Sequence, residues 1–304
     1  MAGVRTSIHS LNGDRHLGAI RLGAYFVLNR ANNALPYSFT DPALAIRDFA
    51  CQSLDQHWGA LPHAASPSRV LSDLFWLTLP WAGIHDELSG IRVLDAGCGS
   101  GSYGPRLLAL ANGLIESYAG TDVHPHEAWP ALKKADRRLR FVVSDAESLR
   151  GAIPDGTNMF VSQSAIEHFD EDMTFFEQVR DYVDRTTGPV LQIHLVPSQA
   201  CLYLYLRHGV RQYTPRTLSK VTRLFGPHAA PVLYRLGGRS CNSLHFSFIT
   251  KPVSLSGRRD GRLVDPAGYE RMLYEAIQDD MQEPQPSPAF YALVIQSRLA
   301  RGAF

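Results

Sequence analysis

The stretch VLDAGCGSG at residues 93–101 joins the end of an apolar run to three glycines spaced two residues apart. Glycine tolerates positive φ angles and leaves no Cβ between the main chain and a bound molecule. A helical pattern follows the glycines, so the loop lies where a strand ends and a helix begins, the edge of a parallel sheet at which ligands bind. Gly97, Gly99 and Gly101 therefore predict a ligand that lies directly against the backbone.

The spacing of the glycines and the acid before them limit the kind of ligand. A dinucleotide-binding loop has the pattern GxGxxG, and here the third glycine of that pattern falls on Ser102. Asp95 precedes the first glycine by two residues. Its charge would repel a pyrophosphate and attract a cationic amino-acid end, so a nicotinamide-linked oxidoreductase is disfavoured.

Short apolar runs alternate with helical patterns beyond this loop. Strands that are buried on both faces have this composition, and alternation with helices indicates a parallel sheet. We therefore expect an α/β fold with a doubly wound, mostly parallel, Rossmann-like sheet of about seven strands. Five runs are regular (91–96, 117–123, 139–144, 158–162 and 189–196), and three more look like strands (230–236, 244–250 and 290–297). Because only two of these three are needed, we place 290–297 in the sheet and treat 238–265 as an insertion.

Helix starts are marked by proline at the first turn, often after a capping residue. Asp41-Pro42 and Ser66-Pro67 both carry this signal, and no convincing strand precedes residue 90. We therefore expect residues 1–89 to form a mostly helical N-terminal cap, and residues 90–304 to form the domain with the ligand loop. The later helices are expected at 105–112, 171–183, from Thr214-Pro215 onward, and at about 267–281.

The composition is that of an ordinary globular protein. The chain has 304 residues, a formal net charge of +1 and four cysteines without a CxxC pair. These values argue against a nucleic-acid partner, a zinc framework and a disulfide framework. The apolar run at 17–28 is interrupted by Arg21 and is too short to span a bilayer. We expect a cytoplasmic protein without stable membrane insertion, and the oligomeric state, including a homodimer, stays open.

Four motifs in order resemble those of class I S-adenosylmethionine-dependent methyltransferases. LDAGCGSGSYG resembles the first motif of that family, Asp122 in AGTDV its ribose-binding acid, and Asp145 in VVSDAESL its adenine-side acid. SQSAIEHF at 162–169 resembles the motif beneath the methionine part of the cofactor. The resemblance implies S-adenosyl-L-methionine as cofactor, bound by Asp95, Gly97, Gly99, Gly101, Asp122, Asp145, Ala146 and Ser162.

Methyl transfer to a hydroxyl requires a base for the hydroxyl proton, and histidine titrates nearest neutral pH. His168 is the first candidate, because it follows the fourth strand at the carboxyl edge. His194, within the fifth strand, is the second candidate, and His245 and His208 remain open. Proximity and orientation of the two reactants then supply much of the acceleration.

The pair Glu167-His168 is similar to part of the E-x-x-E-H metal motif of quinone-ring O-methyltransferases. The first position of that motif is Ser164 in this chain. Two adjacent protein ligands make a poor divalent-ion site without further help, so the sequence predicts no metal.

Substrate recognition is expected outside the cofactor motifs. The segment CLYLYLRHGVRQYTP at 201–215 follows the fifth strand, where family members often insert a substrate lid. Its Tyr203, His208, Arg211 and Tyr213 are candidates for a polar, sugar-like or acidic acceptor site, together with Tyr205 and Arg207. An amphipathic helix with tyrosines against the core explains the segment equally well. Residues 66–76 could close over the cofactor from the N-terminal side.

These motifs favour a methyltransferase that acts on a hydroxyl group of a small molecule or glycan, and the glycan suggestion rests on resemblance alone. Two alternatives stay open: an N-methyltransferase, and a methyltransferase-like binding module without catalysis. An N-methyltransferase would often carry an Asn/Asp-Pro-Pro-Tyr motif where this chain has SQSAIEHF, which counts against that alternative. The second is disfavoured by the intact acids and glycines of the cofactor motifs.

Overall fold

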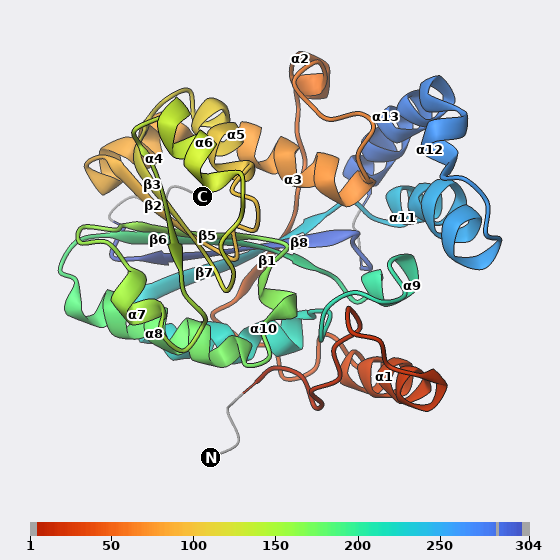
Figure 1. The fold of residues 1–304 in the computed structure, drawn as a ribbon, viewed down its shortest axis with the longest axis horizontal. Coiled ribbons are helices and arrows are strands. Elements are labelled where there is room, and N and C mark those ends of the chain that lie inside the picture. The colour runs from red at the N-terminus through yellow and green to blue at the C-terminus, as the bar shows by residue number, and fades with distance from the viewer. Residues whose placement is uncertain (1–4, 284–285, 300–304) are drawn as a thin grey trace.

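A single open sheet of eight strands organises the computed structural model, which describes residues 5–283 and 286–299 (Figure 1). The strand order is β1-β7-β8-β6-β5-β2-β3-β4. All neighbours are parallel except β8, which runs antiparallel to both β6 and β7. The strands are β1 Ala45–Asp48, β2 Ile91–Ala96, β3 Ile115–Asp122, β4 Leu139–Val143, β5 Met159–Gln163, β6 Val190–Pro197, β7 Ala229–Leu236 and β8 Phe290–Ser297.

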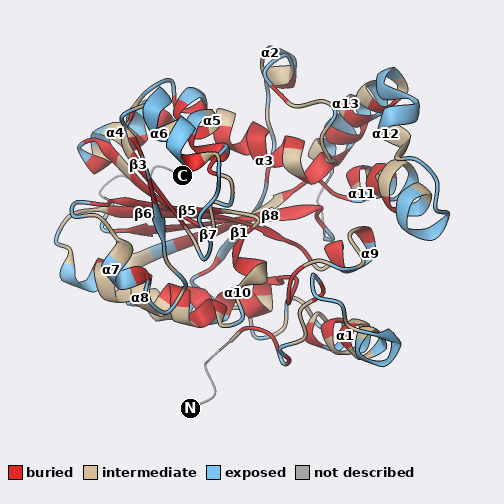
Figure 2. Cartoon of the chain, in the orientation of Figure 1, coloured by how far each residue is buried: buried red, intermediate tan, exposed pale blue. Residues whose placement is uncertain are grey.

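Helices cover both faces of this sheet. One layer holds α3 (Pro67–Leu77), α4 (Trp81–Leu88), α5 (Tyr103–Leu110) and α6 (Trp129–Ala135), and the opposite layer holds α7 (Leu149–Ala152), α8 (Asp172–Arg185) and α10 (Pro215–Thr222) (Figure 1). The sheet between them is buried, as Figure 2 shows. In β6, Ile193 packs into one core cluster and Val196 into the other, because successive side chains of a strand point to opposite faces. The expected doubly wound, mostly parallel architecture is confirmed.

The helix starts that were read from proline and capping residues are largely correct. α3 begins at Pro67, and α10 begins after a capping box in which Thr214 and Thr217 exchange hydrogen bonds. α13 (Pro266–Gln282) also begins at a proline, with the Asp265 carboxylate accepting a hydrogen bond from Gly268 N–H. Local capping chemistry therefore determines where these helices begin.

The expectation of a helix after Asp41-Pro42 is wrong, and with it the count of seven strands. Residues Ala45–Asp48 form β1, an edge strand that pairs in parallel with β7. The Asp41 carboxylate accepts a hydrogen bond from Ala43 N–H and caps only a short turn. The strand is short and largely exposed, so its sequence lacks a period-2 pattern, and it is the free edge of β7 that orders it.

The run 244–250 is not a strand. It lies in a helical insertion made of α11 (Arg239–His245), a π-helical segment η3 (Phe246–Leu255) and α12 (Gly261–Val264). A short apolar run cannot be assigned to strand or helix from periodicity alone. The insertion occupies about the residues expected, and 290–297 is a sheet strand as expected.

The N-terminal region is mostly helical apart from β1. It contains α1 (Ala19–Asn32), α2 (Leu54–Trp58), α3 and α4, and α1 lies near α9 (Cys201–Leu204) (Figure 1). Its first described residues are fixed to the main domain, since the Thr6 N–H donates to the Asp172 carboxylate at 3.0 Å. Among the described residues, none of the helices combines the length and the apolar character needed to cross a membrane.

Candidate active site at the carboxyl edge of the sheet

The glycine loop between β2 and α5 adopts the backbone that its sequence predicts. Gly97, Gly99 and Gly101 have φ angles of +76°, +53° and +75°. A Cβ on Gly97 would lie 2.5 Å from the Cβ of Ala165, and one on Gly101 would lie 2.4 Å from the ring of Phe141. Gly99 faces open space. Two of the glycines therefore allow close packing of the loop, and all three allow its left-handed turns.

Asp122, at the end of β3, closes the loop from the neighbouring strand. Its Oδ2 accepts a hydrogen bond from Gly99 N–H at 2.8 Å, and its Oδ1 accepts one from His124 N–H at 3.3 Å. The indole N–H of Trp129 donates to the Gly99 carbonyl at 2.9 Å. These bonds hold the carboxylate at the cavity mouth, where it retains lone pairs for hydroxyl donors.

Asp145 and Ala146 follow β4 and form the next part of the rim. The Asp145 Oδ1 accepts hydrogen bonds from Glu147 N–H, Ser148 N–H and the Ser148 hydroxyl. The side-chain and backbone bonds of Ser148 lower the pKa of Asp145. All three bonds are on Oδ1, so within the described chain Oδ2 is left for a ligand.

A cavity of about 510 Å³ opens at this edge of the sheet. Such a volume suits a ligand of nucleoside size. Its wall combines backbone of the glycine loop, the two acids and residues that follow β5. The lining includes Ala96, Gly97, Asp122, Asp145, Ala146 and His168.

Asp95 lies beneath the glycine loop rather than in the cavity wall. Its side chain is buried, and Oδ2 accepts a hydrogen bond from the Tyr118 hydroxyl at 2.5 Å. Oδ1 has no hydrogen-bond partner among the described residues. Burial raises the pKa of Asp95 to about 6. The carboxyl can thus act on a ligand in the cavity through its charge and not through direct contact.

Ser162 and His194 lie away from the cavity, and the structure does not support their expected roles. Both are fully buried, with Ser162 Oγ 2.9 Å from His194 Nδ1. The His194 ring packs edge-on against Phe175 and Phe176 of α8. The alternation along β6 turns His194 toward this helix, and burial lowers its pKa to about 3.

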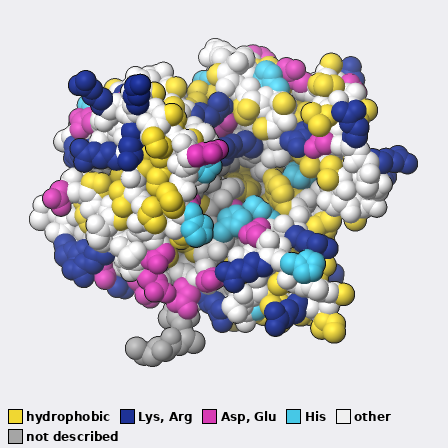
Figure 3. Space-filling view, in the orientation of Figure 1, with side chains coloured by type: hydrophobic (Ala, Val, Ile, Leu, Met, Phe, Trp, Pro, Cys, Tyr) yellow, Lys and Arg dark blue, Asp and Glu magenta, His cyan; other side chains and the backbone are white. Residues whose placement is uncertain are grey.

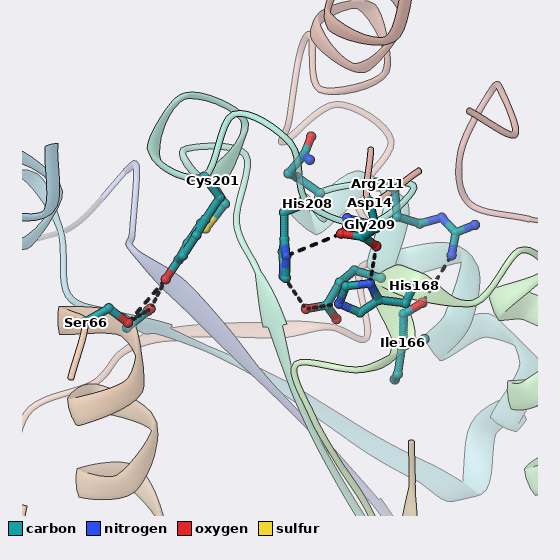
Figure 4. A network of polar contacts seen from close by, with 12 residues as sticks. Asp14, Ser66, Ile166, His168, Cys201, His208, Gly209 and Arg211 are labelled. Atoms are coloured by element: carbon teal, nitrogen blue, oxygen red, sulfur yellow. Dashed lines mark hydrogen bonds and ion pairs between the residues drawn. The ribbon is translucent and has the colours of Figure 1, made fainter. Parts of the chain in front are cut away.

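His168 lines the cavity and is held by a residue from the far N-terminus. It ends the 3₁₀ turn η1 (Ile166–His168) after β5, and its side chain is 34% exposed. The imidazole Nδ1 lies 2.6 Å from Asp14 Oδ2 (Figure 4). Asp14 carries no motif signal in the sequence, so the pair becomes visible only in the folded chain.

His208 completes a polar cluster with these two residues and Glu167. Its ring lies edge to face with that of His168, with centroids 4.6 Å apart, and its Nε2 lies 3.4 Å from Glu167 Oε1. Burial lowers the pKa of His208, but the carboxylates of Glu167 and Asp14 outweigh this effect and raise it. Figure 3 shows histidine side chains gathered around a hollow on this face of the molecule.

A second cavity of about 240 Å³ adjoins the first. Ser164 lines both cavities, and His208 lines the second. The helix α3 contributes the opposite wall of this second cavity, and residues 66–76 do not line the larger cavity over which they were expected to close. The residues from that segment are Ser66, Ser68, Arg69 and Ser72, and their signal in the sequence is a polar stripe on an otherwise apolar helix.

Most of the expected substrate residues point elsewhere. Arg211 and Tyr213 are fully buried, and both contact the Asp172 carboxylate, at 3.5 Å and 2.9 Å. Tyr203 is exposed but lines neither cavity. His245 is buried, and burial lowers its pKa to about 4. Of the segment 201–215, His208 and Tyr205 face the second cavity.

Comparisons with known proteins agree with this geometry. The family model described as "Methyltransferase domain" matches residues 94–185, which include the glycine loop, Asp122, Asp145 and His168. A search of curated protein sequences finds no relative.

Solved structures of similar architecture include several methyltransferases. The plantazolicin methyltransferase BamL, in complex with a triazolic desmethylPZN analog and SAH, is 13% identical, with 93% of this chain and 99% of that chain covered and a TM-score of 0.48. A SAM-dependent methyltransferase from Archaeoglobus fulgidus is 18% identical, with 68% and 86% covered and a TM-score of 0.41. A putative sarcosine dimethylglycine methyltransferase from Galdieria sulphuraria is 11% identical, with 82% and 90% covered and a TM-score of 0.46.

The region that matches the family model contains the residues that line the larger cavity at its glycine-loop side. The glycine loop and the acids after β3 and β4 line one cavity edge within residues 94–185. Residues 94–185 of this chain are thus similar to a methyltransferase domain.

Proposed function

We propose that the protein transfers a methyl group from S-adenosyl-L-methionine to a hydroxyl group of a small-molecule or glycan acceptor. The observation that carries the proposal is the polar cluster of Asp14, Glu167, His168 and His208 at the junction of the two cavities. Such a cluster can take up a hydroxyl proton, which methylation of oxygen requires and methylation of a neutral amine does not.

The larger cavity fits the cofactor of this family. Asp122 would accept hydrogen bonds from the ribose hydroxyls, and Asp145 with Ala146 would border the adenine. The orphaned Oδ1 of Asp95 would supply negative charge beneath the cationic methionine end. When bound, the cofactor supplies an electrophilic methyl group on a positively charged sulfur.

The second cavity is the proposed place of the acceptor. Ser164, shared by both cavities, marks the point where the two bound molecules would meet. Serine hydroxyls of α3 and the Tyr205 hydroxyl offer hydrogen bonds for a polar acceptor. The protein's contribution is then to align the acceptor oxygen with the methyl carbon and to exclude water.

His168 is the proposed proton acceptor in the absence of a bound ion. In this role the Nδ1–H of His168 donates a hydrogen bond to Asp14 Oδ2, which leaves the lone pair of the neutral imidazole on Nε2. As the acceptor oxygen bonds to the methyl carbon, its proton would pass to Nε2. The positive charge then formed on the ring would be stabilised by the Asp14 carboxylate 2.6 Å away.

Cofactor binding and turnover test this proposal separately. Titration calorimetry with S-adenosylhomocysteine should give tight binding to the wild-type chain, and a panel of phenols, sugars and amines should reveal methylation on oxygen. His168→Ala should lower turnover by about 10²–10⁴-fold and leave S-adenosylhomocysteine affinity nearly unchanged.

The same measurements distinguish the alternatives. Products methylated on nitrogen would favour the N-methyltransferase. Binding of S-adenosylhomocysteine with no turnover on any acceptor would favour a binding module without catalysis. A kinetically silent His168→Ala variant would remove His168 from the base role.

A further inference from the structure

The three side chains Glu167, His168 and His208 bring their ligand atoms within 4.8 Å of one another. We propose that they form a binding site for a divalent first-row transition-metal ion, held by one carboxylate oxygen and the Nε2 atoms of the two histidines. The adjacent pair Glu167-His168 makes a poor site by itself, and the sequence therefore predicted none. The fold supplies the third ligand from a segment about forty residues further along the chain.

The orientation of both imidazoles matches that of metal ligands. Their Nδ1 atoms face Asp14, at 2.6 Å for His168 and 3.9 Å for His208. Their Nε2 atoms face Glu167 Oε1, at 4.0 Å and 3.4 Å. A metal-binding histidine usually donates its other ring N–H to a carboxylate, which fixes the tautomer with a lone pair toward the ion. Asp14 is in the position for that role.

The burial of the Glu167 carboxylate is the feature that indicates a bound cation. Its side chain has no exposed surface, and neither of its carboxylate oxygens has a hydrogen-bond partner among the described residues. A buried carboxylate is costly unless close partners replace its water shell, and the nearest imidazole nitrogen, Nε2 of His208, lies at the long distance of 3.4 Å. A cation between Glu167 and the two imidazoles would supply a closer partner than either ring does.

The backbone holds the cluster in place through bonds between distant segments. Gly13 N–H donates to the Gly209 carbonyl at 2.7 Å, and Gly209 N–H donates to Asp14 Oδ1 at 3.0 Å (Figure 4). Val210 N–H donates to the Glu167 carbonyl at 2.8 Å. The ligands therefore lie on two segments that are tied to each other and to the segment of Asp14, and metal–ligand distances of about 2.1 Å require only small side-chain movements.

The donor set defines the class of ion. Two imidazole nitrogens and one carboxylate oxygen suit zinc, manganese, iron or cobalt in the divalent state better than magnesium or calcium, which prefer oxygen ligands. Three protein ligands leave coordination positions open. Because the cluster lies where the two cavities meet, an open position could take an acceptor oxygen, a consequence that rests on the proposed function. In that form His168 holds the ion, and the ion, not the imidazole, lowers the pKa of the hydroxyl.

Metal loading of the full chain tests the site without any acceptor. The purified protein is stripped with EDTA, dialysed against Zn²⁺, and analysed by elemental mass spectrometry and calorimetry. The wild-type chain should retain about one equivalent. Glu167→Gln and His208→Gln should each weaken Zn²⁺ binding by at least about 10–100-fold, as loss of even an outer partner does. Asp14→Asn should weaken it by a similar factor.

His63→Gln is the matched control, because His63 also pairs with a carboxylate, Glu270, at 2.8 Å, and lies outside the cluster. It should load Zn²⁺ like the wild-type chain. If Glu167→Gln fails to fold, His168→Gln and His208→Gln test the same site, since both side chains are about a third exposed whereas Glu167 is fully buried. A variant that still binds S-adenosylhomocysteine is folded, so this binding is measured for each variant.

Three outcomes overturn the inference: no retained Zn²⁺ in the wild-type chain, equal loading of the cluster variants and the wild type, or loss of loading in His63→Gln alone. Loading by the wild type that the cluster variants lose supports it. A chain that retains no Zn²⁺ after loading but methylates a hydroxyl would refute this site and leave the proposed function intact. A chain that loads Zn²⁺ but methylates no hydroxyl would do the reverse.

Discussion

The Nδ1 atom of His168 lies 2.6 Å from Oδ2 of Asp14, 154 residues earlier in the chain. This contact makes the first described residues part of the candidate active site. It places a carboxylate behind His168, which lines the larger cavity, and a carboxylate in that position orients an imidazole for a proton or for an ion.

Asp14→Asn should reduce turnover by about 10–100-fold, because the His168 ring loses the charge that fixes its tautomer and orientation. S-adenosylhomocysteine affinity should change little, since Asp14 is not in the wall of the larger cavity. Steady-state kinetics and calorimetry measure the two quantities. Asp86→Asn, on an exposed acid outside the site, serves as control, and equal turnover of the two variants would contradict the assigned role.

Asp122→Ala should lower S-adenosylhomocysteine affinity by about 10–100-fold, the value of one or two hydrogen bonds to a charged group. The melting temperature should fall only slightly, because the carboxylate bonds to a loop and not to the core. Calorimetry and thermal unfolding measure both effects. Asp136→Ala, before β4 at the opposite edge of the sheet, should leave the affinity unchanged. Unchanged affinity in Asp122→Ala would place the ribose elsewhere.

Gly97→Ala should destabilise the protein more than Gly113→Ala. Both glycines have a φ of +76°, so both variants carry a left-handed alanine that costs about 1–2 kcal/mol. Only at Gly97 would the new Cβ meet another atom, the Cβ of Ala165 at 2.5 Å. Urea unfolding compares the two variants. Equal free energies of unfolding would mean that the loop moves away from Ala165 without cost.

Asp95→Asn should change how stability depends on pH. Burial raises the pKa of Asp95 from 3.8 to about 6. Between these values the folded chain binds a proton that the unfolded chain does not, so this group makes the folded state more stable as the pH falls from 7 to 4. Its ionised form costs up to about 3 kcal/mol at neutral pH. The stability of Asp95→Asn relative to wild type should therefore be more favourable at pH 7.5 than at pH 4.5, as measured by urea unfolding. For an Asp86→Asn control, the difference in free energy of unfolding from wild type should be the same at both pH values. If the difference for Asp95→Asn is also the same at both pH values, the pKa of Asp95 is not raised by burial.

His194 should remain neutral from pH 8 down to at least pH 5, because burial lowers its pKa to about 3. Nitrogen-15 spectra of the imidazoles would show its ring signals unchanged over that range. Titration of His194 near pH 6.5 would mean that water reaches the ring, and it would reopen its role as base.

The sequence by itself determined the doubly wound sheet, most helix starts, the glycine loop and the acids after β3 and β4. Each of these depends on short-range rules: the period of apolar residues, proline and capping residues at helix starts, and glycine where φ is positive. The positions of Gly97, Asp122 and Asp145 around one cavity follow from parallel strands that end at a common edge.

Only the tertiary structure decided the edge strand β1, the burial of Arg211 and Tyr213, and the assembly of the polar cluster. β1 depends on a partner strand far along the chain, and the face of His194 depends on the register of β6 against its neighbours. Asp14, Glu167 and His208 meet because three loops from separate parts of the sequence share hydrogen bonds. Contacts of this kind leave no periodic signal in the sequence, since they arise from the packing of segments that local rules place independently.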